Sequence, residues 1–392
     1  MKQTPGYKGV FLGAAFLMAT SAIGPGFITQ TTTFTRELGA SFGFVILVSV
    51  LLDIGAQLNI WRIITVSKYY AQDLVNKVFP GAGLLLSVLI VLGGIAFNIG
   101  NIAGCGLGLQ VLFGCSVQTG AIISAAIAIM VFVVKQAGRA MDIFARVLGF
   151  AMIALTVYVA IASHPPMGEA LLRTILPLKI NETVILTIVG GTVGGYISFA
   201  GAHRLLDAGI SGESNLGKVS KSSVNAIMIA ALMRIVLFLA ALGIVVKGIS
   251  LDPANPAATV FQSAAGIAGY KLFGLVLWSA AITSVVGSAF TSVSFMKTFH
   301  KTIENNFRYI IIGFIVLSTI IFCLVGQPVK VLIFAGGLNG LILPVALSLI
   351  LIAARKKGIT GNYRHPVWMQ AAGWVVVITM TYMGIKGIIN LV

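Results

Sequence analysis

The stretch Gly24-Pro25-Gly26-Phe27 interrupts the first long apolar segment of the chain. Proline lacks the N–H that a helix interior needs, and glycine lowers helix stability by about 1 kcal/mol relative to alanine. A second interruption, Gly190-Gly191-Thr192-Val193-Gly194-Gly195-Tyr196, lies in the sixth apolar segment. Inside a membrane, a broken helix persists only where it lines a cavity within the protein. Two broken helices at corresponding positions are typical of the substrate site of a secondary transporter.

The composition places the chain in a membrane, because 58% of its 392 residues are hydrophobic and only 9% are charged. A soluble protein of this length cannot bury so much apolar surface. The hydropathy therefore predicts an all-α membrane protein without a soluble domain. Windows of about 20 residues predict eleven transmembrane helices over residues 9–33, 42–66, 82–112, 119–135, 143–163, 183–206, 223–247, 268–296, 308–326, 329–353 and 367–389.

The net charge of +16 follows the predicted topology. Of the 26 Lys and Arg residues, 18 fall on the side of the predicted N-terminus, 7 fall on the opposite side, and Arg234 falls within a span. Cytoplasmic loops of membrane proteins carry the excess of Lys and Arg. We therefore expect a multi-pass protein of the inner membrane, with a cytoplasmic N-terminus and the C-terminus on the opposite side. The basic residues are expected to contact lipid headgroups, and no nucleic-acid partner is expected.

Residues 1–392 are expected to form a single transmembrane transporter domain. Because the first and sixth segments are both broken, inverted repeats are predicted over about 9–163 and 183–353, with an extra helix at about 367–389. No Ser/His/Asp or Cys/His arrangement, phosphate-binding loop or metal-ligand cluster occurs in a suitable setting. The sequence therefore predicts a transporter that works by alternating access, not an enzyme, and no cofactor is expected.

Three stretches besides the first break carry a resemblance to a known family. They are Phe34-Thr35-Arg36-Glu37-Leu38-Gly39-Ala40-Ser41-Phe42-Gly43, Gly106-Leu107-Gly108-Leu109-Gln110-Val111-Leu112-Phe113-Gly114 and Ile188-Val189-Gly190-Gly191-Thr192-Val193. In order and spacing they resemble the NRAMP family of divalent-metal transporters over nearly the whole chain. The resemblance implies a LeuT-type fold of two inverted five-helix repeats with broken helices 1 and 6.

The family's chemistry does not carry over with the fold. Where the family reads Asp-Pro-Gly-Asn, this chain has Gly24, Pro25, Gly26 and Phe27, and where it reads Met-Pro-His, this chain has Gly194, Gly195 and Tyr196. The acidic pair that resembles the family's proton route is replaced by Asn98 and Asn101. A dehydrated dication needs anionic ligands or several oxygen ligands. We therefore predict that the metal and proton sites of the family are lost, and assign no metal ligand.

The N-terminus of a half-helix offers unpaired N–H groups and a partial positive charge, which favour an anionic substrate group. Import of a small organic carboxylate is therefore predicted. Some NRAMP-like bacterial proteins with the Gly-Pro-Gly-Phe pattern resemble partners of 5-oxoproline (pyroglutamate) utilisation, and an amino-acid-like molecule fits the same reasoning. The predicted substrate-binding residues are Gly24, Gly26, Phe27, Gln30, Thr31, Asn98, Asn101, Gly194, Gly195, Tyr196, Ser198 and Asn339.

Several of these assignments have alternatives. The substrate is alternatively a divalent metal ion such as Mg²⁺ or Mn²⁺, held by carbonyl oxygens or as a hydrated ion. Gln30 and the neighbouring threonines alternatively cap unwound backbone, the two span asparagines join helices, and Asn339 satisfies a kink. Asp53 is the candidate coupling group for a proton or sodium ion. Asp53 alternatively pairs with Arg234, and Arg234 alternatively reaches the headgroups.

Overall fold

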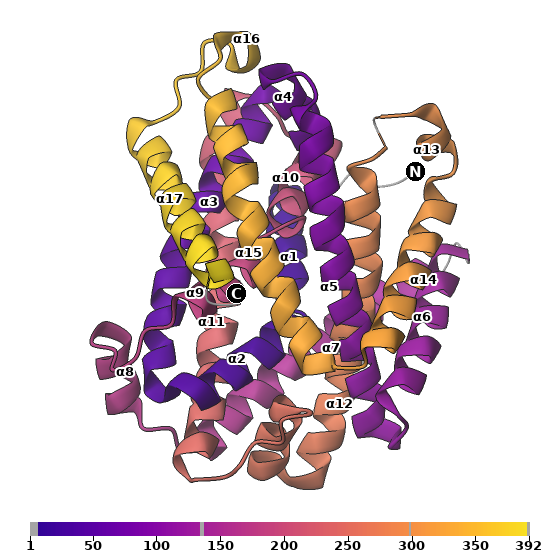
Figure 1. The fold of residues 1–392 in the computed structure, drawn as a ribbon, viewed down its shortest axis with the longest axis vertical. Helices are drawn as coiled ribbons and strands as arrows, with labels where there is room; N and C mark the ends of the chain where they lie inside the picture. The colour runs from indigo at the N-terminus through magenta and orange to yellow at the C-terminus, as the bar shows by residue number, and fades with distance from the viewer. Residues whose placement is uncertain (1–6, 134–136, 298, 390–392) are drawn as a thin grey trace.

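The computed structural model describes residues 7–133, 137–297 and 299–389, and every regular element in these ranges is helical (Figure 1). Residues 134–135, at the end of the predicted fourth span, lie outside these ranges, as do the chain ends at 1–6 and 390–392. The helices are α1 Tyr7–Ala22, α2 Pro25–Leu38, η1 Gly39–Ser41, α3 Phe42–Ser67, α4 Ala71–Val78, α5 Ala82–Phe113, α6 Val117–Val133, α7 Ala137–Ala162, α8 Met167–Ile175, α9 Glu182–Val193, α10 Ile197–Asp207, η2 Glu213–Asn215, α11 Leu216–Val246, α12 Pro256–Ser294, α13 Lys301–Asn305, α14 Phe307–Val325, α15 Pro328–Ala353, α16 Lys357–Thr360 and α17 Val367–Ile389.

Apart from the breaks, each predicted span is occupied by helix within the described residues, but three of the helices begin six or more residues earlier than the hydropathy predicted. α7 begins at Ala137 instead of 143. α11 begins at Leu216 instead of 223, and α12 begins at Pro256 instead of 268. The start of α12 is fixed by a cap, because the Asn255 side chain accepts a hydrogen bond from the Ala258 N–H and proline occupies the first turn. α12 then continues through a kink at Gly266, whose φ of 62° suits glycine. The window missed this first segment because its polar cap lowers the mean hydropathy.

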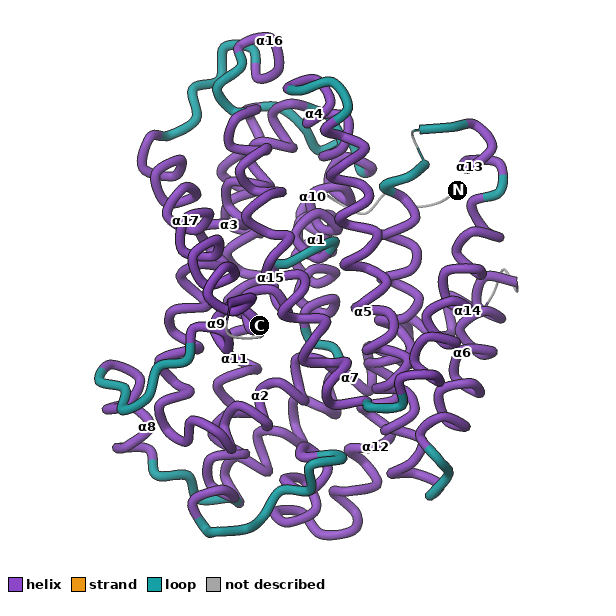
Figure 2. Tube along the Cα trace, viewed as in Figure 1, coloured by secondary structure: helices purple, strands orange, loops and turns teal. Residues whose placement is uncertain are grey.

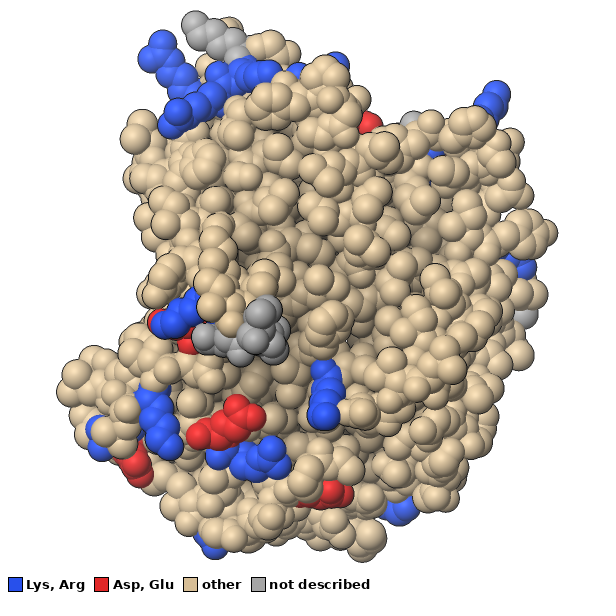
Figure 3. Space-filling model, in the orientation of Figure 1, with Lys and Arg blue, Asp and Glu red and all other residues tan. Residues whose placement is uncertain are grey.

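Within the described ranges, eight helices are long and apolar enough to cross a membrane, or nine if the bent pair α7 and α8 is one span. The number of eleven spans and the inverted repeats over 9–163 and 183–353 therefore stay predictions. Loops gather mainly at the two ends of the helices (Figure 2). On the face seen in Figure 3, charged side chains gather at the top and across the lower half, and the band between them is largely uncharged. This band is what a bilayer requires of a multi-pass protein.

The broken helix α9–α10 lies at the centre of the protein, and its most apolar window is entirely buried. α9 packs closely on α15 because both helices carry glycine where they meet. A Cβ atom on Gly190 would lie 2.0 Å from the Gly336 carbonyl oxygen. Gly190 and Gly191 are therefore helical packing residues, and the prediction that they belong to the break was wrong. The break itself comprises Gly194, Gly195 and Tyr196.

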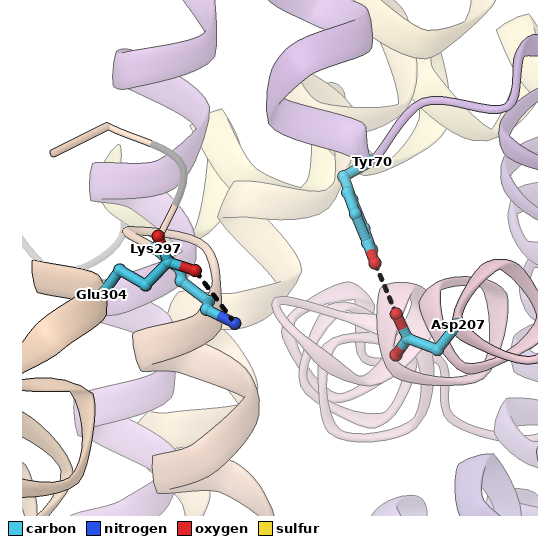
Figure 4. A network of polar contacts seen from close by, with 4 residues as sticks. All are labelled: Tyr70, Asp207, Lys297 and Glu304. Carbon is cyan, nitrogen blue, oxygen red and sulfur yellow. Dashed lines mark hydrogen bonds and ion pairs between the residues drawn. The ribbon is translucent and has the colours of Figure 1, made fainter. Parts of the chain in front are cut away.

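At the end of the protein that carries α4 and α13, polar contacts tie the loops to the helix ends (Figure 4). Tyr70, before α4, donates a hydrogen bond to the carboxylate of Asp207 at the end of α10. Hydrogen bonding to that carboxylate, followed by burial, raises the pKa of Tyr70 to about 12. Lys297 and Glu304 form an ion pair of 3.7 Å between the end of α12 and α13. The Tyr70–Asp207 hydrogen bond holds the last turn of the broken helix against the loop that precedes α4.

Candidate functional site

The first break separates α1 from α2 by two residues, Ile23 and Gly24. Pro25 occupies the first turn of α2, where its missing N–H leaves no intrahelical hydrogen bond unmade. Gly24 is extended, with φ −108° and ψ −171°, which any residue can adopt. Pro25 packs against Gly104 of α5, where a Cβ atom would approach the proline ring to 2.3 Å. The glycine on α5 therefore allows the break to lie against the neighbouring helix.

The second break requires glycine for two separate reasons. Gly195 has a φ of 54°, in the left-handed region that side chains other than glycine rarely adopt. A Cβ atom on Gly195 would also lie 1.9 Å from Oδ1 of Asn339 on α15. After the break, the N–H groups of Phe199 and Ala200 both bond to the Tyr196 carbonyl, at 3.1 and 3.0 Å. The start of α10 therefore satisfies more of its own backbone than an open helix end would.

A small cavity lies between the two broken helices; about 10 Å³ of it is open to the centre of a water-sized sphere, which is room for about one water molecule. None of the described residues that line it carries a charged side chain. The first turn of α2 faces this space, and the N–H groups of a first helical turn have no intrahelical partner. The lining residues are Ser21, Ala22, Gly24, Gly26, Phe27, Gln30, Phe97, Gly100, Asn101, Gly191, Tyr196, Leu332 and Ala335.

Gln30 is the fully buried amide of this cavity. Its Nε2 atom donates a hydrogen bond of 2.9 Å to the Leu332 carbonyl oxygen, which fixes the orientation of the amide. Its Oε1 atom has no hydrogen-bond partner in the described part of the chain. Glycine at 191 and 336 leaves room for the amide, because a Cβ atom at either position would lie within 2.6 Å of it. Gln30 thus presents one unused acceptor in an apolar surrounding.

A neutral polar network joins α5, α12, α14 and the second break beside the cavity. Ser288 on α12 donates a hydrogen bond of 3.0 Å to Oδ1 of Asn98 and accepts one of 3.5 Å from Nδ2 of Asn101. The Tyr196 side chain hydrogen-bonds to the same serine. Asn98 also donates to Ser318 on α14 at 3.1 Å. All of these side chains are uncharged, so the network positions its members without carrying an ionised group.

Aromatic rings form the apolar walls. Tyr196 meets Phe97 edge to face, with ring centroids 5.6 Å apart and an interplanar angle of 88°. Phe27, in the first turn of α2, is 2% exposed. The guanidinium carbon of Arg234 on α11 lies 4.2 Å from the centroid of the Phe27 ring. Cation–π contact of this kind is favourable in a dry environment.

Half of the predicted substrate-binding residues line the cavity, namely Gly24, Gly26, Phe27, Gln30, Asn101 and Tyr196. The other six, Thr31, Asn98, Gly194, Gly195, Ser198 and Asn339, lie outside its lining.

Hydrogen bonds explain where the polar members of the second group lie. Thr31 donates to the Phe27 carbonyl at 2.7 Å, and Ser198 donates to the Val193 carbonyl, so both hydroxyls serve the backbone of their own broken helix. Asn339 donates hydrogen bonds to the carbonyls of Gly93 and Ala335 at 3.0 and 2.8 Å, and its side chain packs against Gly195 of the second break.

Two wall residues and the network serine were missed by the sequence reasoning. Phe97 directly precedes Asn98, so an inward-facing third span could have indicated it. Leu332 and Ser288 carry no sequence signal, because one is an ordinary apolar residue and the other is one of many small polar residues in the spans.

The two intramembrane charges come together at a second cavity, which shares Phe27 with the first. Asp53 on α3 and Arg234 on α11 both line it and are 2% and 3% exposed. Arg234 is therefore buried inside the protein, and the alternative that it reaches the headgroups was wrong. Nη1 of Arg234 donates a hydrogen bond of 3.0 Å to Thr192 on α9.

Among the described residues, no group of three His, Cys, Asp or Glu side chains is arranged to hold a metal ion. His203, the histidine nearest to the second break, makes its contacts outside the cavity between the broken helices. Its Nε2 atom accepts a hydrogen bond of 3.1 Å from the Ala71 N–H, and its ring packs against Tyr70, Phe199 and Phe295.

A family model described as natural resistance-associated macrophage protein-like (Nramp) matches residues 15–390. The uncharacterised membrane protein YcsG of Bacillus subtilis is 60% identical, over 98% of this chain and 96% of that protein. The divalent metal cation transporter MntH of Staphylococcus saprophyticus is 21% identical, over 97% of this chain and 92% of that protein.

Two solved structures share the fold at low sequence identity. The Eremococcus coleocola manganese transporter superposes with a TM-score of 0.73 at 14% identity, covering 99% of this chain and 88% of that chain. MhsT, solved in complex with L-phenylalanine, superposes with a TM-score of 0.63 at 18% identity, and the match covers 99% of both chains. The described helices therefore have a LeuT-like arrangement.

Proposed function

Because the chain belongs to the Nramp family of membrane transporters, we propose that the cavity between its broken helices binds and transports a small organic carboxylate by alternating access. The observation that carries this proposal is the uncharged lining of the cavity at the first turn of α2. The positive end of a helix dipole and its unpaired N–H groups favour an anion. A dehydrated dication at the same place would lack the anionic ligands that it needs.

The carboxylate is assigned to the first turn of α2, where glycine at position 26 lets the backbone approach a ligand closely. The N–H groups of residues 26 and 27 are the donors at this turn, since the N–H of Ile28 already bonds to the Gly24 carbonyl at 3.3 Å. The start of α10 offers fewer donors because the N–H groups of Phe199 and Ala200 already bond to the Tyr196 carbonyl. The anion is therefore bound by one helix end, and the second break mainly contributes Tyr196.

The remaining polar groups suit a small molecule with one hydrogen-bond donor. The unused Oε1 of Gln30 can accept a hydrogen bond from a substrate N–H, and Asn101 lines the same cavity. In a state of the transport cycle in which the cavity is wider, Phe27, Phe97 and Tyr196 would enclose a small ring. 5-Oxoproline has a carboxylate, a lactam N–H and a compact ring, so it is the probe of choice. An amino-acid-like substrate would use the same groups.

A divalent metal ion is the second candidate substrate, and the relatives favour it. MntH of Staphylococcus saprophyticus is a divalent metal cation transporter, and the Eremococcus coleocola structure is that of a manganese transporter. In this chain such an ion would rely on neutral oxygen atoms, since the cavity lining carries no carboxylate. Manganese and magnesium therefore belong in every test of the carboxylate.

The proposal is tested by thermal-shift measurements on the purified full-length protein. 5-Oxoproline is expected to raise the melting temperature because a ligand that binds only the folded state stabilises it. 2-Pyrrolidinone, the same lactam ring without the carboxylate, is expected to have little effect, as are MnCl2 and MgCl2. Stabilisation by a metal salt and not by 5-oxoproline would replace the proposal with metal transport.

A further inference from the structure

A buried cavity beside the candidate substrate site contains one acid and one base. It has about 10 Å³ open to the centre of a water-sized sphere and is lined by residues of α2, α3, α9 and α11, including Asp53 and Arg234. The two charges act on each other electrostatically. Ion pairs with N···O distances up to 4.0 Å are formed elsewhere in the described residues, by Lys297 with Glu304 and by Lys386 with Glu182. Asp53 and Arg234 are not among the pairs within that distance in the described residues, so the two side chains share a cavity without direct ion pairing.

Several polar atoms at this cavity have no hydrogen-bond partner in the described ranges. They are Oδ1 of Asp53, Nε and Nη2 of Arg234, and Oγ of Ser49. The Thr192 hydroxyl that accepts from Arg234 donates in turn to the Ile188 carbonyl at 2.8 Å, so it offers no further donor. Buried charges in a membrane protein pair with one another or mark a pathway for ions and protons. Here the pairing is incomplete on both sides, which leaves donors and an acceptor for additional ligands.

Phe27 connects this cavity with the candidate substrate site. Its ring lines both cavities and lies against the Arg234 guanidinium at 4.2 Å. Phe27 also belongs to the first turn of α2, where the substrate carboxylate is assigned. Phe27 therefore lies between the Arg234 guanidinium and the turn to which the carboxylate is assigned.

The charge balance of the two cavities then links substrate to proton. Arg234 carries one positive charge and Asp53 one negative charge, so a substrate carboxylate adds a second negative charge to the same buried region. An opposite charge favours the ionised form of an acid, and a second anion competing for that charge disfavours it. Binding of the carboxylate and protonation of Asp53 therefore favour each other, as linked equilibria must.

Arg234 is the charged group that lines this cavity together with Asp53. The other charged or titratable groups on the helices packed against α3 do not line it. They are Arg36 and Glu37 on α2, Arg62 on α3 itself, Asp73 and Lys77 on α4, Glu169 and Arg173 on α8, Glu182 on α9, His203, Arg204 and Asp207 on α10, Lys218 and Lys221 on α11, Lys330 on α15, and Tyr382 and Lys386 on α17.

We propose that the Phe27 ring moves aside during transport, so that Arg234 adds its charge to the binding of the carboxylate at the first turn of α2 while Asp53 takes up one proton, and that the protein is therefore an electroneutral carboxylate–proton symporter. The proton comes from the solution on the entry side and leaves Asp53 on the exit side when the carboxylate departs and Arg234 again faces Asp53. No bond other than the O–H bond of Asp53 forms or breaks. This inference rests on the proposed carboxylate substrate.

The test uses the full chain in liposomes, with radiolabelled 5-oxoproline outside and a pH-sensitive dye inside. With an acidic exterior, the wild type is expected to accumulate 5-oxoproline together with one proton per molecule, independently of the membrane potential. Asp53→Asn is expected to equilibrate 5-oxoproline without accumulating it and without proton entry. Arg234→Gln is expected to bind it about 10- to 150-fold more weakly, because a charge-assisted hydrogen bond is lost. The exposed Glu169→Gln and Arg364→Lys are the matched controls and should behave as the wild type.

The double variant Asp53→Asn/Arg234→Gln keeps the proposal testable if a single variant fails to fold. It leaves no unpaired buried charge, which is the usual reason for such a failure. The double variant is expected to transport weakly and without protons. Proton-coupled accumulation by Asp53→Asn or by the double variant would overturn the inference, as would wild-type uptake without proton entry. These results leave the carboxylate substrate intact, whereas wild-type uptake of Mn²⁺ and not of 5-oxoproline would refute both proposals.

Discussion

Replacement of Gly24 by aspartate tests the charge preference of the cavity. The backbone at this position is extended, with φ −108° and ψ −171°, so an aspartate fits it without strain. A Cβ atom there would lie 3.3 Å from Oγ of Ser284 and 3.6 Å from Oδ1 of Asn101, so small shifts of these side chains admit it. The new carboxylate would face the cavity close to the first turn of α2. Gly24→Asp therefore places a fixed anion beside the assigned position of the substrate's own carboxylate.

The size of the effect follows from Coulomb's law. Two like charges about 5 Å apart repel by about 3 kcal/mol at an effective dielectric constant of about 20. Since each 1.4 kcal/mol corresponds to about a tenfold change in affinity, the variant should bind 5-oxoproline about 200-fold more weakly than its control. The control is Gly24→Asn, which has the same shape and no charge and is expected to remain within a few-fold of the wild type.

Equilibrium binding to the purified protein, by isothermal titration calorimetry at neutral pH, measures this difference. A melting temperature for each variant shows whether the two proteins are equally folded. If Gly24→Asp binds 5-oxoproline as tightly as Gly24→Asn, the carboxylate does not bind at the first turn of α2. A gain of Mn²⁺ binding in Gly24→Asp alone would show that the cavity has the geometry for a metal ion and lacks only the charge.

Two further predictions concern stability. Ser288→Ala removes the donor to the buried Oδ1 of Asn98 and is expected to lower the free energy of unfolding by about 1–3 kcal/mol in a denaturation assay. The control is Ser348→Ala, which loses a hydrogen bond of 2.9 Å to the Val345 carbonyl of its own helix and should have a smaller effect in the same assay. His365 has a pKa lowered from 6.5 to about 4, first by burial and then by Arg62. Because the unfolded chain binds this proton more readily, the free energy of unfolding should fall as the pH decreases from about 6.5 towards about 4. The melting temperature of His365→Gln should decrease less than that of the wild type over that range. Identical pH profiles of the two proteins would contradict the lowered pKa of His365.

The sequence predicted the helical breaks better than the contacts between helices. The Gly-Pro-Gly break and the position of Tyr196 follow from local backbone chemistry, and the structure has both. Gly190 and Gly191 were misassigned because a glycine that serves close helix packing looks the same in sequence as one that ends a helix. The position of Arg234 over Phe27 joins residues more than 200 positions apart, and no local pattern encodes that contact.

The polar residues near the breaks show the same limit. Gln30 and Thr31 are adjacent in sequence, yet the amide lines the cavity and the hydroxyl bonds to its own helix. Which of two neighbouring side chains faces the cavity depends on how α2 is rotated against α9 and α15. Hydropathy does not determine that rotation, because α2 is buried on several sides.

The identity of the ligand between the broken helices is the central claim, and a crystal structure tests it most directly. The protein would be crystallised with both 5-oxoproline and MnCl2, and diffraction would be recorded at the manganese absorption edge. We predict electron density for the acid at the first turn of α2, with its carboxylate against the N–H groups of Gly26 and Phe27 and no anomalous peak in the cavity. A strong anomalous peak between α2 and α10, without density for the acid, would contradict the account and identify a metal site.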